Sequence, residues 1–482
     1  MQKRFFSSLA LSLFLNLLIK PVSVLFIDAG VQRVLGNEEY GNYFVLLSLT
    51  LVFNIFLDLG INNYTTRFIA QNNSLINEHV RKTIPLRILL FLSYVVLVFI
   101  TAFLIGIEFS CAGILLILIL NQFLIQSIAL VRSLLSGLHL FKTDAVLSVM
   151  DRALLILFMG GILIFDRQSV TIMSFVLCQF LGYFISFLFS LYYIRRQIHG
   201  HLFQLDFTYI RDVLRKSFPF ALLVLLMLVY NRFDVVLLKK IALNGAFQAE
   251  IYAQGFRLLD AFYMLGMIFA GLLYPLFSKM LIENKNDLHS VVHITAKLLI
   301  GGAFGVLIIA FFNGDFLLSL IYGDKVNQAS IQAFIWLMGA FTAMSFNFIF
   351  GTLLTTAGEM RIMNAVALTG VIISVSANVL MIPYFGAVGS AMVALFTQTI
   401  VSTLLVLYVK IKLGVFLDKK SIIYLLGYLL TLILFKLLTR GQFSATTTIL
   451  VDLIAILIVA LVFSIIDLKS LKKIWALNDL HQ

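Results

Sequence analysis

The chain has 482 residues, of which 61% are hydrophobic and only 12% are charged. A water-soluble protein of this length needs many more charged side chains to cover its surface, so the composition excludes a soluble enzyme or binding protein. The formal net charge is +12, and its basic side chains gather in short segments between apolar runs. We interpret this charge as facing anionic lipid headgroups, and we expect no nucleic-acid partner.

The apolar residues form long runs that recur along the whole chain. A helix needs about 20 apolar residues to cross about 30 Å of hydrocarbon, and helices satisfy their own backbone there. The runs therefore predict an all-α integral membrane protein with about 14 transmembrane helices. They cover residues 9–30, 41–60, 84–106, 112–135, 146–165, 170–194, 217–239, 251–274, 291–312, 331–356, 362–383, 386–409, 421–437 and 446–466. We expect the first run to be a retained helix, because Ile27-Asp28-Ala29 is a poor signal-cleavage site.

The distribution of Lys and Arg predicts the orientation. Most of the 35 basic residues fall in segments on the side of the N-terminus, with Arg87, Arg132 and Arg152 counted among them. Lys436 is counted with the outer side. Because cationic segments resist translocation, we expect the basic side to be cytoplasmic, together with both termini.

Residues 195–216 form the longest stretch between spans. Within it, apolar residues recur at helical spacing opposite charged ones, which predicts an amphipathic helix on the cytoplasmic face. Tyr40-Gly41-Asn42-Tyr43 precedes the similar Glu250-Ile251-Tyr252 by about 209 residues, which indicates an internal repeat.

The repeat predicts two lobes of about six helices each, related by a pseudo-twofold axis along the membrane normal. We expect an N-terminal lobe, a cytoplasmic linker, a C-terminal lobe, and two extra helices with a cytoplasmic tail. These parts cover residues 1–194, 195–216, 217–410 and 411–482. Cys111 and Cys178 have no histidine spaced to join them, so we expect no disulfide, metal site or cofactor.

Ionisable residues inside apolar spans are costly and are functional candidates by default. Lys20, Arg232 and Arg257 place one cation in each of three predicted spans. We expect these three residues to bind a phosphate or diphosphate, because guanidinium and ammonium groups match phosphate oxygens. Structural ion pairing remains open for all three, and Arg257 could also extend to the outer interface.

Four acidic residues are candidates for coupling-ion sites or for ion pairs. Asp28 and Asp58 lie at predicted helix ends, where solvation is an alternative role. Arg257 and Asp260 are spaced for a pair on one helix face. Asp234 lies close to Arg232 in sequence, although residues two apart do not face each other on a helix.

The stretch Arg33–Tyr43 (RVLGNEEYGNY), with FLDLGI at 56–61 and TRFIA at 66–70, resembles the Wzx-like polysaccharide flippases that carry lipid-linked O-antigen units. Further segments that resemble this family are IYA at 251–253, YPLFS at 274–278 and IPYFGAVGSA at 382–391. The resemblance spans nearly all of residues 5–410. It implies membership of the multidrug, oligosaccharidyl-lipid and polysaccharide exporter superfamily, with two lobes around a cavity that opens alternately to each side.

The resemblance also implies a substrate and a location. The substrate would be an oligosaccharide on undecaprenyl diphosphate, moved across the bacterial inner membrane during polysaccharide and lipopolysaccharide synthesis, with membrane lipids and the polysaccharide polymerase machinery as partners. A peptidoglycan precursor flippase and a small-molecule antiporter of the same superfamily are the alternatives. A polymerase or ligase is disfavoured because no outer loop exceeds about 20 residues, so we expect a transporter and not an enzyme.

Overall fold

The computed structural model describes residues 15–16, 18–71, 75–138, 140–195, 203–283, 285–439, 442 and 445–465. The first residues of the predicted first span, part of the predicted linker and the C-terminal tail lie outside these residues. Every regular element in the described part of the chain is helical. The chain divides into two compact units, Met1–Ala253 and Gln254–Gln482.

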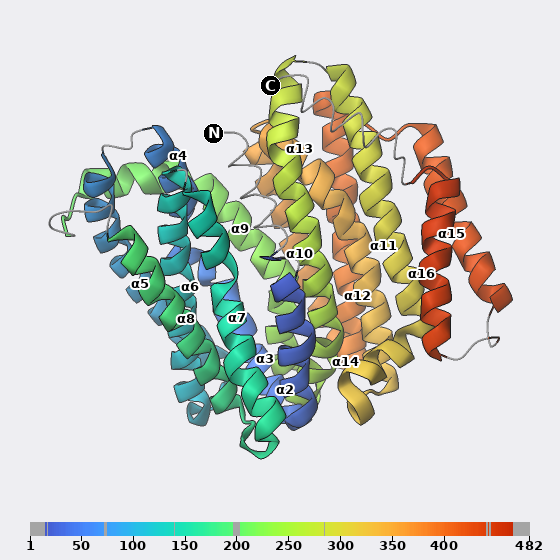
Figure 1. Ribbon diagram of the computed structural model, residues 1–482, viewed down its shortest axis with the longest axis horizontal. Helices are drawn as coiled ribbons and strands as arrows, with labels where there is room; N and C mark the ends of the chain where they lie inside the picture. The colour runs from blue at the N-terminus through green and yellow to red at the C-terminus, as the bar shows by residue number, and fades with distance from the viewer. Residues whose placement is uncertain are drawn as a thin grey trace. The chain divides into compact units, whose positions relative to one another are not determined.

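The first unit is a bundle of helices, drawn in blue to green in Figure 1. Residues 18–22 are helical and continue into a π-helical segment, η1. The elements are η1 (Ser23–Asp28), α2 (Ala29–Val34), α3 (Asn37–Val52), η2 (Asn54–Leu57), α4 (Ile61–Gln71), α5 (Ile76–Ile105), η4 (Phe109–Cys111), α6 (Ala112–Gly137), α7 (Phe141–Phe165), η5 (Arg167–Ser169), α8 (Ile172–Ile194) and α9 (Phe207–Ile241). Helix α6 is central, since it packs on α3, α4, α5, α7 and α8.

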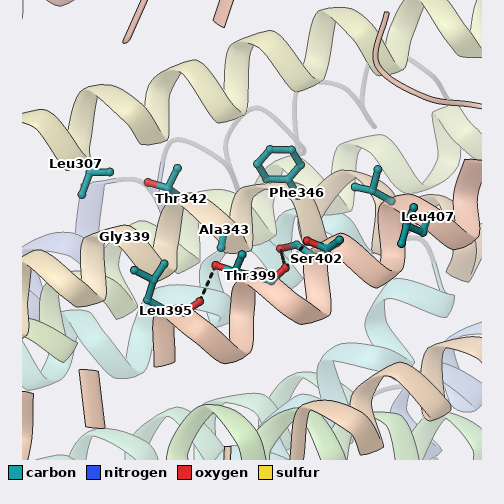
Figure 2. A pocket seen from close by; sticks show the side chains of 11 residues that line it. Leu307, Gly339, Thr342, Ala343, Phe346, Leu395, Thr399, Ser402 and Leu407 are labelled. Carbon is teal, nitrogen blue, oxygen red and sulfur yellow. Dashed lines mark hydrogen bonds between the residues drawn. The ribbon is translucent and has the colours of Figure 1, made fainter. Parts of the chain in front are cut away.

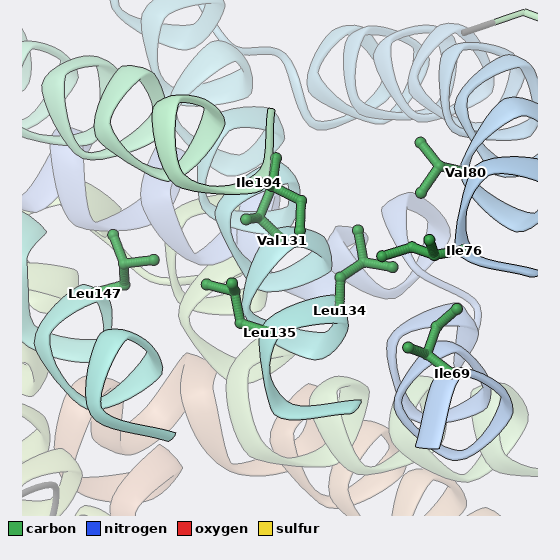
Figure 3. Packing of buried hydrophobic residues seen from close by; sticks show 8 residues of the cluster. All are labelled: Ile69, Ile76, Val80, Val131, Leu134, Leu135, Leu147 and Ile194. Atoms are coloured by element: carbon green, nitrogen blue, oxygen red, sulfur yellow. The ribbon is translucent and has the colours of Figure 1, made fainter. Parts of the chain in front are cut away.

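One apolar cluster joins five of these helices, as Figure 3 shows. Val131, Leu134 and Leu135 of α6 contact residues of α4, α5, α7 and α8. These branched aliphatic side chains are buried against one another, and their close packing fixes the spacing of the helices. The other members of the cluster are Ile69, Ile76, Val80, Leu147 and Ile194.

The second unit is built around α12. Helix α10 (Gly245–Glu283) continues from the first unit into the second. The remaining elements are α11 (Lys285–Tyr322), η6 (Gly323–Lys325), α12 (Gln328–Phe346), η7 (Asn347–Gly351), α13 (Thr352–Thr356), α14 (Met360–Leu413), α15 (Lys419–Thr439) and α16 (Ala445–Val462). Helix α12 packs between α11 and α14, while α15 and α16, red in Figure 1, pack on α11 and on each other.

The helices agree closely with the predicted apolar runs. Ten helices among the described residues are long and apolar enough to cross a membrane, and α16 supplies a shorter apolar helix. Helix α14 contains two predicted runs, which meet at the non-helical Gly386, where φ is 53°. The prediction of an all-helical membrane fold is therefore confirmed.

The structure differs from the sequence-based expectation in two segments. The amphipathic stretch is not a separate helix: Phe207 begins α9, which continues without interruption through the next span. Helix α3 ends at Val52, before the end of the second predicted span at residue 60, and after η2 the chain turns at Leu59 and Gly60, which have positive φ values of 45° and 82°. A positive φ costs little at Gly60, which lacks a Cβ, whereas at Leu59 it requires support from the surroundings.

Candidate functional site

The three predicted substrate-binding cations lie in different surroundings. Lys20 is half-buried in the helical segment before η1, and Arg232 is half-buried on α9. Arg257 is only 7% exposed on α10. Lys20 and Arg232 belong to the first compact unit and Arg257 to the second. That the three bind one substrate group together remains a prediction.

Of the predicted acidic residues, Asp58 forms an ion pair. Its Oδ1 lies 2.8 Å from Nη2 of Arg87, a residue of α5. The same oxygen accepts a hydrogen bond from the Asn62 backbone at 3.0 Å, and Oδ2 accepts one from Gly60 at 3.2 Å. Asp58 therefore caps α4 directly after the helix break.

Arg87 satisfies the remaining polar groups at the break. Its Nη1 donates to the carbonyl oxygen of Leu57 at 2.7 Å, and its Nη2 also donates to the side chain of Asn62. Irregular backbone at membrane depth is tolerated only where its polar groups find partners in the protein. Arg87 thus explains how the FLDLGI sequence can interrupt a span.

An amide network extends from this break into the bundle. Asn62 donates to Gln126 at 3.3 Å, Gln126 donates to Asn54 at 2.5 Å, and Asn54 donates to Gln122. These residues join η2 and α4 to α6. The side-chain amides in this network hydrogen-bond to one another, which favours a structural role in linking the helices.

Asp234 is 3% exposed and its Oδ2 accepts a hydrogen bond from the Tyr252 hydroxyl, while Oδ1 accepts one from the Val235 backbone at 2.8 Å. Arg232 interacts with it electrostatically. Asp28 is also 3% exposed, and Asp260 is half-buried on α10. The coupling-ion roles of these acidic residues stay predictions.

The Tyr40-Gly41-Asn42-Tyr43 motif mediates contact between α3 and α10. A Cβ on Gly41 would lie 1.8 Å from the Ala246 carbonyl oxygen, so only glycine permits this approach. Nearby, Gln32 donates to Oε1 of Glu250 at 3.1 Å. The repeated motif therefore serves, at least in its first copy, to pack two helices tightly.

Two further residues of the first unit form a charged region in the bundle. Arg152 lies near the middle of α7, and its Nε is 3.7 Å from the carboxylate of Asp151. Lys20 is close enough to interact electrostatically with both. Asp28 is also close enough to interact electrostatically with Arg152.

Three cations within apolar helices were not named among the candidate residues by the sequence analysis. It counted Arg87 and Arg152 with the inner segments and Lys436 with the outer side, and the structure places all three within apolar helices. The signal was present in the sequence, because each falls inside a predicted apolar run. The rule that charges within such runs are functional candidates applies to them as much as to Lys20.

Lys436 belongs to a buried cluster in the second unit. Its Nζ lies 2.5 Å from Oδ2 of Asp452, and the two side chains are 5% and 4% exposed. Asn313 of α11 donates to the same carboxylate at 2.7 Å and accepts from Lys436 at 3.2 Å. Asn313 is also the non-helical residue at which α11 bends. This cluster joins α15 and α16 to α11.

The second unit also has an apolar groove of about 470 Å³ between α11, α12 and α14 (Figure 2). The hydroxyl groups that line it donate hydrogen bonds to backbone carbonyl oxygens of these helices. For example, Thr399 donates to Leu395 at 2.8 Å and Thr403 donates to Thr399 at 2.7 Å. The groove thus offers an apolar surface that suits a hydrocarbon chain.

Sequence and structure comparisons identify the family. Residues 7–281 match the family model described as "Polysaccharide biosynthesis protein". No curated protein matches the chain in sequence. Among solved structures, the fold is similar to the inward closed conformation of the lipid II flippase MurJ, with a TM-score of 0.64 and 16% identity over 95% of this chain and 96% of that one.

Two other solved structures have the same fold. An inward-facing multidrug resistance MATE family transporter of the MOP superfamily gives a TM-score of 0.63 at 14% identity, covering 82% of this chain and 94% of that one. A MOP superfamily transporter from Pyrococcus furiosus, described as having a binding pocket of reverse polarity, gives 0.55 at 12% identity, covering 84% and 94%.

The family match covers more than half of the chain, and the three structural likenesses each extend over most of it. The family match shows the link to polysaccharide biosynthesis, and the likenesses show that the fold is the one seen in these transporter structures. The chain belongs to the polysaccharide biosynthesis protein family, and it has the fold of the MOP superfamily of membrane transporters.

Proposed function

We propose that this protein is a flippase that moves an undecaprenyl-diphosphate-linked oligosaccharide from the inner to the outer leaflet of the bacterial inner membrane. The substrate is an O-antigen unit or a similar polysaccharide repeat unit. The family match and the cations at membrane depth support this proposal together. The observation that carries it is the retention of Lys20, Arg232 and Arg257 in apolar helices, which an anionic substrate explains.

Two chemical parts of the proposed substrate, the diphosphate and the polyprenyl chain, find matching groups among the described residues. The diphosphate is held by Lys20, Arg232 and Arg257 through charge-assisted hydrogen bonds. The polyprenyl chain remains in lipid or lies along apolar surface such as the groove between α11, α12 and α14. The two compact units alternate between an inward-open and an outward-open state, and the substrate shifts this equilibrium only through different affinity for the two states.

The proposed topology places both termini in the cytoplasm, where the synthesis of lipid-linked units would load the transporter. The polysaccharide polymerase machinery is the proposed partner on the opposite side. A flippase for lipid-linked peptidoglycan precursor is the second candidate, because the likeness to the MurJ structure extends over 95% of the chain. The two functions differ in the saccharide and share the lipid diphosphate.

The test is complementation in a strain that lacks its own polysaccharide flippase. The wild-type gene should restore surface polysaccharide, while alanine at Lys20, Arg232 or Arg257 should reduce it and the alternative basic residue should preserve it. Membrane levels of each variant are measured alongside. Normal polysaccharide from all three alanine variants at normal protein levels would refute this site. Rescue of a MurJ-depleted strain instead would favour the second candidate.

A further inference from the structure

The start of α9 contacts two earlier helices of the first unit through polar side chains. The hydroxyl of Tyr209, on the first turn of α9, lies 2.8 Å from Nδ1 of His79 and 3.1 Å from the hydroxyl of Thr83, both on α5. The other ring nitrogen of His79, Nε2, lies 2.8 Å from the hydroxyl of Thr65 on α4. One imidazole, which is only 2% exposed, therefore bridges α4, α5 and α9.

An ion pair lies beside this bridge. Nζ of Lys82 on α5 is 3.0 Å from Oδ2 of Asp206, the residue that caps α9, and 2.8 Å from Oε1 of Glu78. The same ammonium group lies 5.7 Å from the centre of the Tyr209 ring. We call residues 206–213 of α9 the strap, because these contacts attach them to α5.

The contacts of the strap differ in kind from those on another face of α5. Ile76 and Val80 of α5 belong to the apolar cluster that joins five helices. The strap is attached by hydroxyl groups, an imidazole and charges, together with a smaller apolar cluster that contains Ile210 and Val213. Each polar contact contributes modestly because water can take its place, and lipid can replace apolar contacts between helices. The strap can therefore detach more easily than the rest of the unit.

The surroundings of His79 suit a neutral imidazole. Its ring stacks on Phe68 with a centroid distance of 5.0 Å, and the rings of Tyr64 and Tyr209 lie at 6.0 Å each. Among the described residues its hydrogen-bond partners are hydroxyl groups, and none is a carboxylate. A protonated imidazole in this position would be a buried charge without a counter-ion, which is costly.

The charged side chains around His79 do not offset such a charge. Lys82, three residues further along α5, would repel it, and the carboxylates of Glu78 and Asp206 are already paired with Lys82. The other charged side chains described on the strap, on α5 and directly before α4 are Arg81, Arg211, Asp212 and the pair of Arg87 with Asp58. Protonation of His79 therefore favours a position of the strap in which the imidazole meets water.

We infer that the strap is a pH-sensitive switch, in which neutral His79 holds residues 206–213 against α4 and α5 and protonation of His79 releases them. A histidine in water titrates at about pH 6.5, so the released state gains protons below about that pH. Loss of the Asp206 carboxylate requires a lower pH, because hydrogen bonds hold the pKa of Asp206 below its ordinary value of about 4. The switch does not depend on the identity of the transported molecule.

The test measures the distance between spin labels on the strap and on α5, in the full-length protein in lipid nanodiscs. The labels are attached at Arg211→Cys and Leu89→Cys, which are exposed, after Cys111 and Cys178 are replaced by serine. At about pH 7 one short distance should dominate, and a second, longer distance should increase several-fold towards about pH 5.

Two variants and two matched controls identify the groups responsible. His79→Gln removes the titrating group and should abolish the pH dependence. Tyr209→Phe keeps the ring but loses the bridging hydroxyl, so it should increase the longer distance already at about pH 7. Tyr64→Phe removes a hydroxyl that makes no hydrogen bond within the described part of the chain, and His289→Gln removes an imidazole of the second unit. Both controls should behave like the wild type.

A single distance at every pH in the wild type and in folded Tyr209→Phe would overturn the inference. A second distance whose pH dependence persists in His79→Gln but disappears in Asp206→Asn would also overturn it, because the ion pair would then be the titrating element. Lower thermal stability of Tyr209→Phe with an unchanged distance distribution would give the bridge a structural role alone. His79→Asn replaces His79→Gln if the latter does not fold.

Discussion

Nη2 of Arg87 lies 2.8 Å from Oδ1 of Asp58, across the point where the second span loses its helical conformation. The pair is 9% and 13% exposed, and the arginine also binds the Leu57 carbonyl oxygen at 2.7 Å. One side chain thus satisfies both the carboxylate and the backbone of the break. This contact between α5 and the end of η2, which is long-range in sequence, stabilises the non-helical backbone there.

Removal of Arg87 should destabilise the first unit strongly. Arg87→Gln leaves the Asp58 carboxylate without its counter-ion, and loss of one partner of a buried pair typically costs about 3–5 kcal/mol. We expect a clearly lower thermal unfolding temperature in detergent. Asp58→Asn should cost less, because an asparagine can still cap α4. Equal stability of Arg87→Gln and the wild type would contradict this role.

Gly41 is predicted to be irreplaceable for steric reasons. In Gly41→Ala the new Cβ meets the Ala246 carbonyl oxygen, so α3 and α10 must separate. Overpacking of this kind costs about 1–3 kcal/mol. The matched control is Gly161→Ala on α7, where a Cβ would meet nothing within 4 Å. Thermal unfolding should show a loss for the first variant and none for the second; equal effects would argue against a tight contact at Gly41.

The buried pair of the second unit can be examined by a double-mutant cycle. Lys436→Met and Asp452→Leu each leave one charge unpaired, and each should lower stability by several kcal/mol. The double variant should be less destabilised than the sum of the single changes, because no charge remains buried. The unfolding free energies or temperatures of all four proteins measure the coupling. Simple additivity would show that Lys436 and Asp452 do not stabilise each other.

The start of α9 should weaken in acid. Hydrogen bonds from the Thr208 side chain, the Tyr209 backbone and Lys82 hold the pKa of Asp206 well below its ordinary value of about 4. Because the folded-state pKa is lower than the unfolded one, the carboxylate contributes its stabilisation above about pH 4, and this is lost as the pH falls. Hydrogen exchange of residues 203–216, corrected for intrinsic rates, should increase in acid.

Asp206→Asn provides the comparison for that measurement. The variant lacks the titrating group, so its exchange in this segment should depend less on pH and should resemble the acid form of the wild type. The Asp206 carboxylate accepts backbone hydrogen bonds from Thr208 and Tyr209, both at 3.1 Å, which is the cap that protonation weakens. An unchanged pH profile in the variant would assign the acid effect to another group.

The sequence predicted the helices well because membrane spans are recognised by length and apolar content alone. It also named Lys20 and Asp58 as candidates, since charges stand out in such runs, and the substrate-binding role of Lys20 stays a prediction. It did not pair Asp58 with Arg87, because the two residues are brought together only by packing of α5 against η2. The same limitation applies to Arg152: its position in an apolar run was visible, but its electrostatic interaction with Lys20 depends on how the first span packs against α7.

The central claim is transport, and the most direct measurement uses proteoliposomes made with the purified protein. A short-chain polyprenyl-diphosphate oligosaccharide with a fluorescent label is placed in both leaflets, and an enzyme that cannot cross the membrane cleaves the saccharide from outside. Vesicles with the wild-type protein should allow nearly all substrate to be cleaved, whereas protein-free vesicles and the Lys20→Gln variant should protect about half. Protection of half the substrate by wild-type vesicles would contradict the flippase account.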